Sequence, residues 1–488
     1  MLNVNVGVLG HIDSGKTSLV RVLSNHFSTA ALDANPQSRA RGITLDLGFS
    51  SFTVPATPRW KQNGDVENVQ FTLVDCPGHA SLIRTIIGGA QIIDAMILVI
   101  DVTKGVQTQT AEGLIIGEIT AGKMVVALNK CDLLPDVDRS VMIEKMKLRL
   151  QKTLAGTKFS GCPIVQVSAN PGSSADNLDA SKPAPAASGV AELIDTIMGH
   201  FDPPVRKGDP FLFYVDHCFP IKGQGTVMTG TVISGEISVN ETMELPELRI
   251  QKKIKSMQVF HKAVQHIRKG DRAGICVTQL DSKLMERGLA CSVGAVKVLK
   301  GAVVCVNRIK YFKQTCTSKS KMHEDEYIYN EGMEEGKKQW ALLSFDSPVY
   351  SPDNSVIIAS KLDTDVNANT CRLAFHGRME KIVDPTNREE LSRLKIYTIK
   401  SREGNIDRVA DDRTLIGKDL FKKETDMSLF IGLKVVRSSN GDVGVIESSF
   451  GSSGKFKVRF NKDQKDKEGR LVLTYKRYRF SDTKKLTQ

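Results

Sequence analysis

The sequence has few of the features that mark secreted or membrane proteins. Its nine cysteines are an odd number and contain no C-x-x-C pair, so neither a disulfide framework nor a zinc framework of that spacing is expected. This cysteine usage indicates a reducing compartment and mostly buried free thiols. No apolar run reaches the about 18 residues of a membrane span, and the chain opens directly on an apolar run at Leu2, which leaves no room for a signal peptide. We therefore expect a cytoplasmic protein with no membrane partner.

The chain of 488 residues is too long for one hydrophobic core, and its 41% hydrophobic and 25% charged residues are ordinary for globular proteins. The net charge of +12 is unevenly distributed. Residues 385–488 contain 24 Lys and Arg against 15 Asp and Glu, which places +9 of the +12 in the last fifth of the chain. This excess indicates an acidic polymer as partner. The alternative is a solvated basic surface that has no partner. Because the C-terminus is basic, a second location in the nucleus also remains open.

A phosphate-binding loop is predicted at the stretch G-H-I-D-S-G-K-T-S, from Gly10 to Ser18. It follows an alternating apolar run and precedes an amphipathic one, which is the strand, turn and helix that such a loop requires. The glycines let backbone N–H groups surround phosphate oxygens, Lys16 would reach the β- and γ-phosphates, and the Thr17 hydroxyl would bind Mg²⁺. The predicted nucleotide contacts here are Asp13, Ser14, Gly15, Lys16, Thr17 and Ser18.

Two further segments predict a switch that depends on the γ-phosphate. Thr44, in the string R-G-I-T, lies in a turn-rich segment and would bind Mg²⁺ only while the γ-phosphate is present. The strand from Val69 to Val74 ends in D-C-P-G-H, where Asp75 would hold the metal's water shell and Gly78 would donate its N–H to the γ-phosphate. His79 then stands where it can orient the attacking water, and we predict that it is the catalytic residue.

The identity of the base is predicted from N-K-C-D, which follows the apolar strand Met124–Leu128. The Asp132 carboxylate can accept two hydrogen bonds from guanine, and adenine offers no such pair of donors. Asn129 and the stem of Lys130 would hold and cover the ring, and S-A-N would place a backbone N–H near the guanine O6 through Ser168, Ala169 and Asn170. Ligands bind beyond the carboxyl ends of strands in open α/β sheets. We therefore predict an enzyme that hydrolyses GTP to GDP and phosphate, with Mg²⁺.

These segments predict an α/β domain with a doubly wound sheet over residues 1–203, with a flexible insertion at 171–189 and a closing helix from Val190 to His200. From Phe211 short strands punctuated by glycine replace the strand and helix alternation. We predict β-rich domains at 204–298 and 299–384 and a basic, mostly β domain at 385–488.

The forms G-H-I-D-S-G-K-T, R-G-I-T, D-C-P-G-H, N-K-C-D and S-A-N resemble those of the translational GTPases. In that family the histidine at position 79 activates water, and two apolar residues, by position Ile12 and Ile43, gate its approach. The segments G-Q-G-T-V-M-T-G-T and G-D-R-A-G-I resemble the second-domain β-barrel of elongation factors, and R-L-A-F-H-G-R-M-E resembles the third. The resemblance implies two β-barrels that bind aminoacyl-tRNA together with the GTPase domain.

A basic fourth domain is what the selenocysteine-specific elongation factors of archaea and eukaryotes add, and V-D-H-C-F and G-D-R-A-G-I-C-V-T-Q resemble their eukaryotic form. A selenol is more acidic than a thiol, whose pKa is about 8.5, so an amino-acid pocket should carry cationic donors. The resemblance places this pocket at Asp216, His217 and Arg272. The alternative is that Asp216 and Arg272 form a structural ion pair inside the barrel.

The resemblance implies a monomer whose partners are selenocysteinyl-tRNA and the ribosome, with hydrolysis stimulated by the ribosome. The basic domain is expected to contact RNA, either the long variable arm of the tRNA or the selenocysteine recoding element with its binding protein. Two other functions remain open from the sequence. One is another tRNA carrier, such as an initiation-factor γ subunit or a general elongation factor. The other is a GTP-switched scaffold associated with RNA.

Overall fold

The structure of the protein is a computed structural model. Thr44 and Ile43 of the predicted switch, Gly78, His79 and most of the predicted insertion lie outside the described residues, so these predictions remain untested.

Contacts divide the chain into two compact units, one of Met1–Val298, Val304–Glu324 and Val349–Glu380 and one of Leu299–Val303, Asp325–Pro348 and Lys381–Gln488. The predicted boundaries at 203, 298 and 384 remain predictions. The structure describes residues 1–27, 47–61, 66–76, 87, 91–171, 186–204, 210–310, 339–361, 371–394, 396–451, 453–464, 466–478, 480 and 486–488.

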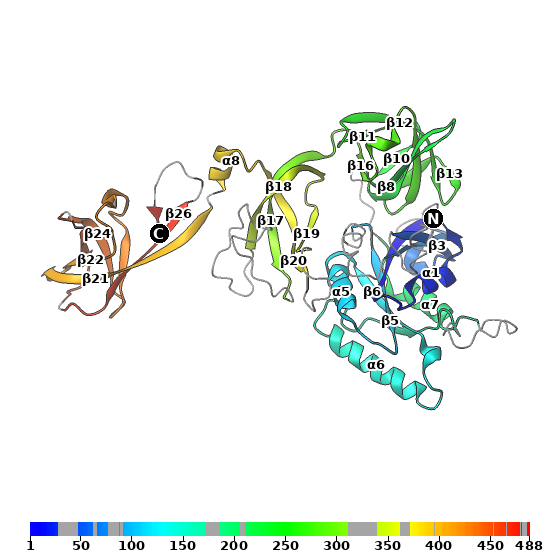
Figure 1. Ribbon diagram of the computed structural model, residues 1–488, viewed down its shortest axis with the longest axis horizontal. Helices are drawn as coiled ribbons and strands as arrows, with labels where there is room; N and C mark the ends of the chain where they lie inside the picture. Colours follow the sequence, from blue (N-terminus) through cyan, green and yellow to red (C-terminus); the bar gives the residue numbers. More distant parts are fainter. Residues whose placement is uncertain are drawn as a thin grey trace. The chain divides into compact units, whose positions relative to one another are not determined.

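The first part of the chain forms a seven-stranded mixed sheet in the order β2-β3-β4-β1-β5-β6-β7 (Figure 1). Strands β4, β1, β5, β6 and β7 pair in parallel, and β2, β3 and β4 pair antiparallel at one edge. The predicted α/β nucleotide domain is therefore confirmed, with an antiparallel edge that was not foreseen. The strands are β1 Leu2–Gly10, β2 His26–Phe27, β3 Gly48–Pro55, β4 Asn68–Asp75, β5 Ala95–Asp101, β6 Lys123–Asn129 and β7 Ile164–Gln166.

Helices cover both faces of this sheet, which explains the unbroken apolar run of β5. Ala95, Ile97 and Val99 belong to one core cluster, and Met96 and Leu98 to the other. The first cluster includes residues of α1 and α7, and the second includes residues of α5 and α6. The predicted helix at Val190–His200 is confirmed. The helices and turns are α1 Lys16–Leu23, α3 Pro58–Lys61, α5 Thr108–Thr120, η2 Cys131–Leu133, α6 Arg139–Leu154 and α7 Val190–His200.

A closed β-barrel follows. Strand β11 pairs with β16 and with β12, so the sheet order β11-β16-β8-β9-β15-β12-β13 closes on itself. Gly225 has φ +131°, and a Cβ there would lie 2.3 Å from the Val277 carbonyl oxygen, so the hairpin between β8 and β9 requires glycine. The predicted barrel is confirmed. The strands of this sheet are β8 Leu212–Ile221, β9 Gly225–Ser234, β11 Thr242–Leu245, β12 Ile250–Val259, β13 Lys262–Val264, β15 Arg272–Val277 and β16 Gly288–Cys291. The strands β10 Glu236–Ser238 and β14 His266–Arg268 pair with one another in a separate sheet, and η3 is Ser282–Leu284.

The barrel is joined to the nucleotide domain through the polar residues of β1. The side chain of Asn5 donates to the Gly270 carbonyl oxygen at 3.1 Å, and that of Asn3 donates to Asp271 at 3.3 Å. Tyr214 donates its hydroxyl to Gln91 at 2.6 Å. The alternation of β1 in the sequence therefore does not mark a solvent-facing side, because the asparagines between its valines are buried too.

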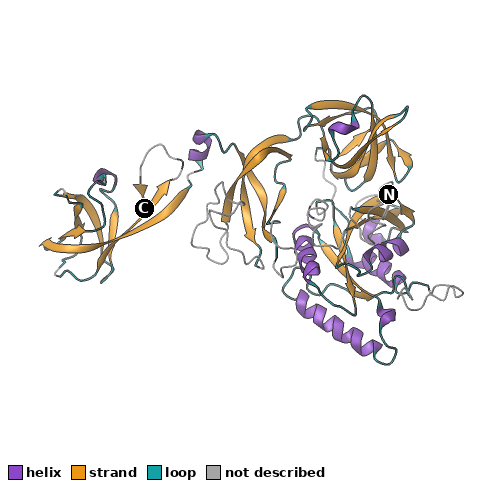
Figure 2. Ribbon diagram, viewed as in Figure 1, coloured by secondary structure: helices purple, strands orange, loops and turns teal. Residues whose placement is uncertain are grey.

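Among the described residues from 297 onward, strands predominate and α8 is the one α-helix, as Figure 2 shows. Four strands form a sheet in the order β18-β17-β20-β19, and a last sheet has the order β21-β22-β25-β24-β23-β26-β27, closed by pairing of β21 with β26. In the described residues no helix is long and apolar enough to cross a membrane. The elements are β17 Lys297–Arg308, β18 Gln339–Ser351, β19 Val356–Ser360, β20 Leu373–Val383, α8 Arg388–Arg393, β21 Tyr397–Asp411, β22 Thr414–Lys418, η5 Met427–Leu429, β23 Lys434–Arg437, β24 Val443–Phe450, β25 Lys455–Phe460, β26 Arg470–Tyr478 and β27 Leu486–Thr487.

A buried ion pair connects α5 to the residue that precedes β20. Arg372 donates from Nε and Nη2 to the two carboxylate oxygens of Glu112, at 3.1 and 2.6 Å. The two side chains are only 6% and 9% exposed, and the apolar residues Ile116 and Leu373 pack nearby in one cluster. Removal of one partner would leave a buried, uncompensated charge.

We predict that Arg372→Met lowers the free energy of unfolding by about 3–5 kcal/mol, the usual cost of breaking a buried pair. The double variant Glu112→Met/Arg372→Met should recover most of that loss because no lone charge remains. Urea denaturation measures both. As a control, Arg393→Met removes the exposed pair with Glu389 and should cost less than about 1 kcal/mol. A double variant that is no more stable than the single variant would contradict the explanation.

Candidate functional site

The loop between β1 and α1 has the backbone of a phosphate-binding loop. Gly10 and Gly15 have φ of +155° and +87°, and Asp13 has φ +58°. A Cβ at Gly15 would lie 2.2 Å from Nδ2 of Asn129, so only glycine fits there. Lys16 Nζ donates to the His11 carbonyl oxygen at 2.8 Å, and burial lowers the pKa of Lys16 although Asp75 opposes that shift. The loop therefore holds an ammonium group at the helix N-terminus, where phosphate would bind.

Thr17 and Asp75 are brought together as the sequence predicted for metal ligands. The Thr17 hydroxyl donates to a carboxylate oxygen of Asp75 at 2.7 Å, and Asp75 is fully buried at the end of β4. A hydroxyl and a carboxylate are hard oxygen ligands, which fit Mg²⁺. The described residues contain no cluster of three His, Cys, Asp or Glu that could hold a metal. A site of one carboxylate and one hydroxyl suits Mg²⁺, because this ion usually takes its other ligands from phosphate and water.

The Asn129 side chain connects three loops. Its Nδ2 donates to the Ser14 carbonyl oxygen at 2.9 Å, and its Oδ1 accepts from the Ala169 N–H at 3.1 Å. The Asp132 N–H donates to the Ser168 hydroxyl at 3.2 Å. The loops predicted to hold phosphate and base therefore meet at one edge of the sheet, beyond the carboxyl ends of β1, β6 and β7.

The role of Asp101, the last residue of β5, was not predicted from the sequence. Lys130 Nζ lies 2.9 Å from Asp101 Oδ2, and Lys130 has φ +64°, so the pair fixes a left-handed residue. Burial opposes ionisation of Asp101, but hydrogen bonds from Thr103 and Lys130 lower the pKa of its carboxyl overall. The sequence signal is that Asp101 is the polar residue at the end of an apolar strand, as Asn129 is. In the structure the two residues are register partners at the same edge of the sheet.

The neighbouring cysteine of the D-C-P-G-H string is chemically protected. Cys76 is fully buried, and burial, aided by Asp75, raises the pKa of its thiol to about 12. The thiolate is the reactive form of cysteine. Cys76 is therefore an inert core residue at neutral pH.

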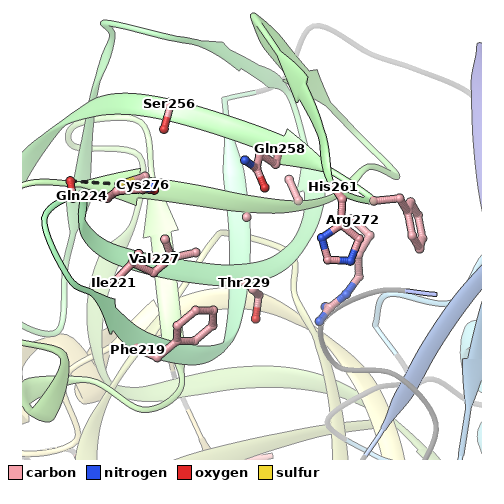
Figure 3. Close-up of a pocket in the computed structure, with 13 residues that line it drawn as sticks. Phe219, Ile221, Gln224, Val227, Thr229, Ser256, Gln258, His261, Arg272 and Cys276 are labelled. Carbon is pink, nitrogen blue, oxygen red and sulfur yellow. Dashed lines mark hydrogen bonds between the residues drawn. The ribbon is translucent and has the colours of Figure 1, made fainter. Parts of the chain in front are cut away.

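The barrel contains a cavity of about 120 Å³ with Arg272 and His261 at one end and Ile221, Gln224 and Cys276 at the other (Figure 3). Arg272 is 3% exposed and forms an ion pair through Nη1 with Asp216, which also accepts from the Thr229 hydroxyl at 2.8 Å. The structural ion pair weighed against the pocket is thus formed. The pocket interpretation stays a prediction. Arg272 Nη2 is buried and has no hydrogen-bond partner among the described residues.

The other predicted pocket residues are placed differently. Asp216 and His217, which are adjacent in β8, are not among the residues that line the cavity, although Asp216 is paired with Arg272. His261, Gln258 and Phe219 line the cavity and were not predicted from the sequence. His261 has φ +65° in the turn between β12 and β13, a position that only the three-dimensional barrel brings beside β9 and β15. Ile12 is half-buried in the phosphate-binding loop, whereas its predicted gate partner Ile43 is outside the described residues.

Family models match most of the chain. Residues 1–203 match the model described as the elongation factor Tu GTP binding domain. Residues 323–377 match the third domain of eukaryotic selenocysteine-specific elongation factors, and residues 392–485 match the eEFSec C-terminal RIFT domain.

Similar proteins cover nearly the whole length. The chain is 47% identical to the selenocysteine-specific elongation factor of Mus musculus, over 94% of this chain and 88% of that protein. It is 30% identical to that of Methanocaldococcus jannaschii, over 95% of each. The crystal structure of translation elongation factor SelB from Methanococcus maripaludis with the GTP analogue GPPNHP shares the fold, with a TM-score of 0.74 and 24% identity over 98% of this chain and 99% of that one.

We predict that Asp101→Asn weakens GDP binding about three- to tenfold, because Lys130 loses a partner worth about 1 kcal/mol and covers the base less firmly. Titration with a fluorescent guanine nucleotide measures this. Asp136→Asn, at an exposed ion pair, is the control and should change nothing. The pKa of Asp101 is lowered in the folded protein. The contribution of its carboxylate to the Lys130 contact is therefore present above the ordinary pKa of 3.8 and is lost as pH falls through the lowered pKa. A difference in GDP affinity between wild type and variant that grew toward acid pH would contradict this.

Proposed function

The chain belongs to the family of selenocysteine-specific elongation factors and is a translational GTPase, and we propose that it delivers selenocysteinyl-tRNA to the ribosome, where UGA is recoded as selenocysteine. GTP hydrolysis is the release switch. Two observations support the proposal: the predicted phosphate and base loops meet at one sheet edge through Asn129, and the barrel has a cavity lined by the buried Arg272. We place this action in the cytoplasm.

Mg²⁺ is part of the proposal. The hydroxyl of Thr17 and the carboxylate of Asp75, 2.7 Å apart, support it. When bound, the ion would neutralise charge on the β- and γ-phosphates. Lys16 holds the phosphates from the helix N-terminus, and Asn129 fixes the loops around them. Thr44 as a further ligand, Gly78 as a donor to the γ-phosphate and His79 as the residue that orients water remain predictions, as does stimulation by the ribosome.

We propose that Arg272 selects the amino acid. Its Nη1 is occupied by Asp216, so Nη2 is the donor left for an anionic group in the cavity. Selenocysteine is largely a selenolate at neutral pH, whereas serine is neutral. A donor that carries charge makes a stronger hydrogen bond to an anion than to a hydroxyl. Asp216 orients the guanidinium, and His217 is retained as a candidate contact to the ester.

The test is protection of the aminoacyl ester against hydrolysis in the presence of GTP, compared among selenocysteinyl-, seryl- and cysteinyl-tRNA. Wild type should protect the selenocysteinyl form selectively. Arg272→Ala should lower that protection at least about tenfold while changing seryl-tRNA protection little, since a charged hydrogen bond contributes about 1.5–3 kcal/mol. Equal loss for both would refute the pocket. Protection of many aminoacyl-tRNAs would indicate a general carrier, and protection of none would favour a scaffold.

The last domain is proposed to contact RNA, with the recoding element and its binding protein as the expected partner. Its basic excess is concentrated late, with 12 Lys and Arg against four Asp and Glu in residues 451–488. On the ribbon of β21 and β26, Lys476 lies 4.9 Å from the centre of the half-exposed Tyr397 ring, and Tyr397 contacts Tyr478. Arg477 is exposed on the neighbouring position. Cations beside half-exposed aromatic rings suit phosphate contacts and base stacking.

We predict that Lys476→Ala/Arg477→Ala weakens RNA binding and lowers the slope of log affinity against log salt by about 1–2, one phosphate contact each. Filter binding with the recoding element and, separately, with the selenocysteine tRNA distinguishes the two RNAs. Arg459→Ala/Arg470→Ala is the charge-matched control, because both arginines form ion pairs, with Glu447 and Glu403. An unchanged slope for both RNAs would disprove contact at this ribbon.

A further inference from the structure

The outer face of the last sheet carries four neighbouring valines, here called the valine row: Val436, Val443, Val445 and Val472. Val436 of β23 is the register partner of Val443 in β24 and of Val472 in β26. Val443, Val436 and Val445 are 50%, 42% and 38% exposed, and Val472 is half-buried. Opposed side chains of adjacent strands lie within contact distance of one another. The valine row is therefore one continuous apolar patch.

The valine row is not part of the hydrophobic core. The alternate residues of the same strands, among them Val435, Ile446 and Leu471, belong to the core cluster of this sheet and are fully buried. Successive side chains of a strand point to opposite faces, so the row faces away from the core. The next row on this outer face contains the exposed pair Ser401 and Thr474. The strands thus accept polar residues there, and the valines are not required by the fold.

The charges beside the valine row are neutralised by one another. Glu403, which faces the row from β21, is paired with Arg470 at 2.9 Å. Arg459, which faces it from β25, is paired with Glu447 at 3.2 Å. An apolar centre with a polar rim is the composition of a protein interface. RNA contacts need unpaired cations and aromatic rings, and the valine row supplies neither.

The valine row lies on the same face of β26 as the ribbon proposed to contact RNA. Val472 and Lys476 are four residues apart in one uninterrupted register, and residues an even number apart share a face, about 13 Å from each other here. We propose that the valine row is a docking site for a protein with an apolar contact surface that is bound to the same RNA as the ribbon. This inference rests on the proposed function, in which that RNA is the recoding element. It assigns the protein of that complex to the valine row and the RNA to Lys476 and Arg477.

The experiment places a charge of either sign in the valine row. Val436→Lys and Val436→Glu are made in the full-length protein. Val141→Lys and Val141→Glu are the matched controls, because Val141 is a 67% exposed valine of α6, outside this sheet. Val436→Thr keeps the branched shape that suits a strand and repeats the measurement without a charge. Affinity is measured by anisotropy of the labelled recoding element, alone and with its binding protein bound.

Wild type should bind the protein–RNA complex at least about tenfold more tightly than the RNA alone, because two linked contacts reinforce one another. Both charged variants should lose most of this advantage, since a charge of either sign is costly in an apolar interface. Val436→Thr should lose a smaller part of it. All three should bind the RNA alone within about twofold of wild type, because the ribbon lies beyond the Debye length of about 10 Å. An unchanged RNA affinity also shows that the domain is folded. The Val141 variants should match wild type throughout.

Tighter RNA binding by Val436→Lys together with weaker RNA binding by Val436→Glu would show that RNA occupies the row, and would overturn the inference. Unchanged affinity of both variants for the complex would overturn it too, as would equal affinity of wild type for the complex and for the RNA alone. Each of these outcomes leaves selective ester protection of selenocysteinyl-tRNA intact. The proposed function is overturned separately, by the absence of that selectivity in wild type.

Discussion

The two hydrogen bonds of the Asn129 side chain are the constraint on which the nucleotide site depends. The sheet places the ends of β1, β6 and β7 at one edge, and the Asn129 side chain then bonds the loops that follow β1 and β7 to one another, while the Asp132 N–H adds a bond to Ser168. The buried carboxamide accepts from one loop and donates to another, and it excludes any side chain at Gly15. An unmade bond here would leave a buried polar group unsatisfied, which costs more than the bond contributes. The phosphate and base halves of the site are therefore fixed together.

Local signals made much of this site predictable from the sequence. The phosphate-binding loop, Asp75 and N-K-C-D each follow an apolar run, and strand ends in such sheets converge. What could not be predicted is what distant segments do to one another. Arg272 was named by resemblance, but its contact with Phe49 requires the barrel to be docked on β3, and the Glu112–Arg372 pair joins residues far apart in the chain. The burial of Asn3 and Asn5 could not be predicted for the same reason, because alternation in a strand does not say what covers each face.

The buried charges of this protein have different consequences. Asp101 and Lys130 form a partly exposed pair that holds a strained backbone residue, and Glu112 and Arg372 satisfy one another in a bidentate contact. Arg272 differs from both pairs, because its Nη1 is paired with Asp216 while its Nη2 has no hydrogen-bond partner among the described residues, a condition that Arg139 Nε shares. A buried donor left in that condition is costly in a merely structural role. The amino-acid pocket proposed above would give this donor a partner.

The closure of the last sheet has a consequence for how the protein is made. Strand β21 pairs along its first half with β26, although β22, β23, β24 and β25 lie between them in the chain. During synthesis β21 emerges with both edges of its N-terminal half unpaired and stays so until β26 follows. Unpaired edges are templates for association with other chains. The cations along β21 and β26 repel a second copy of the same ribbon, so the charge that suits a nucleic acid also protects the nascent chain from its neighbours on a polysome.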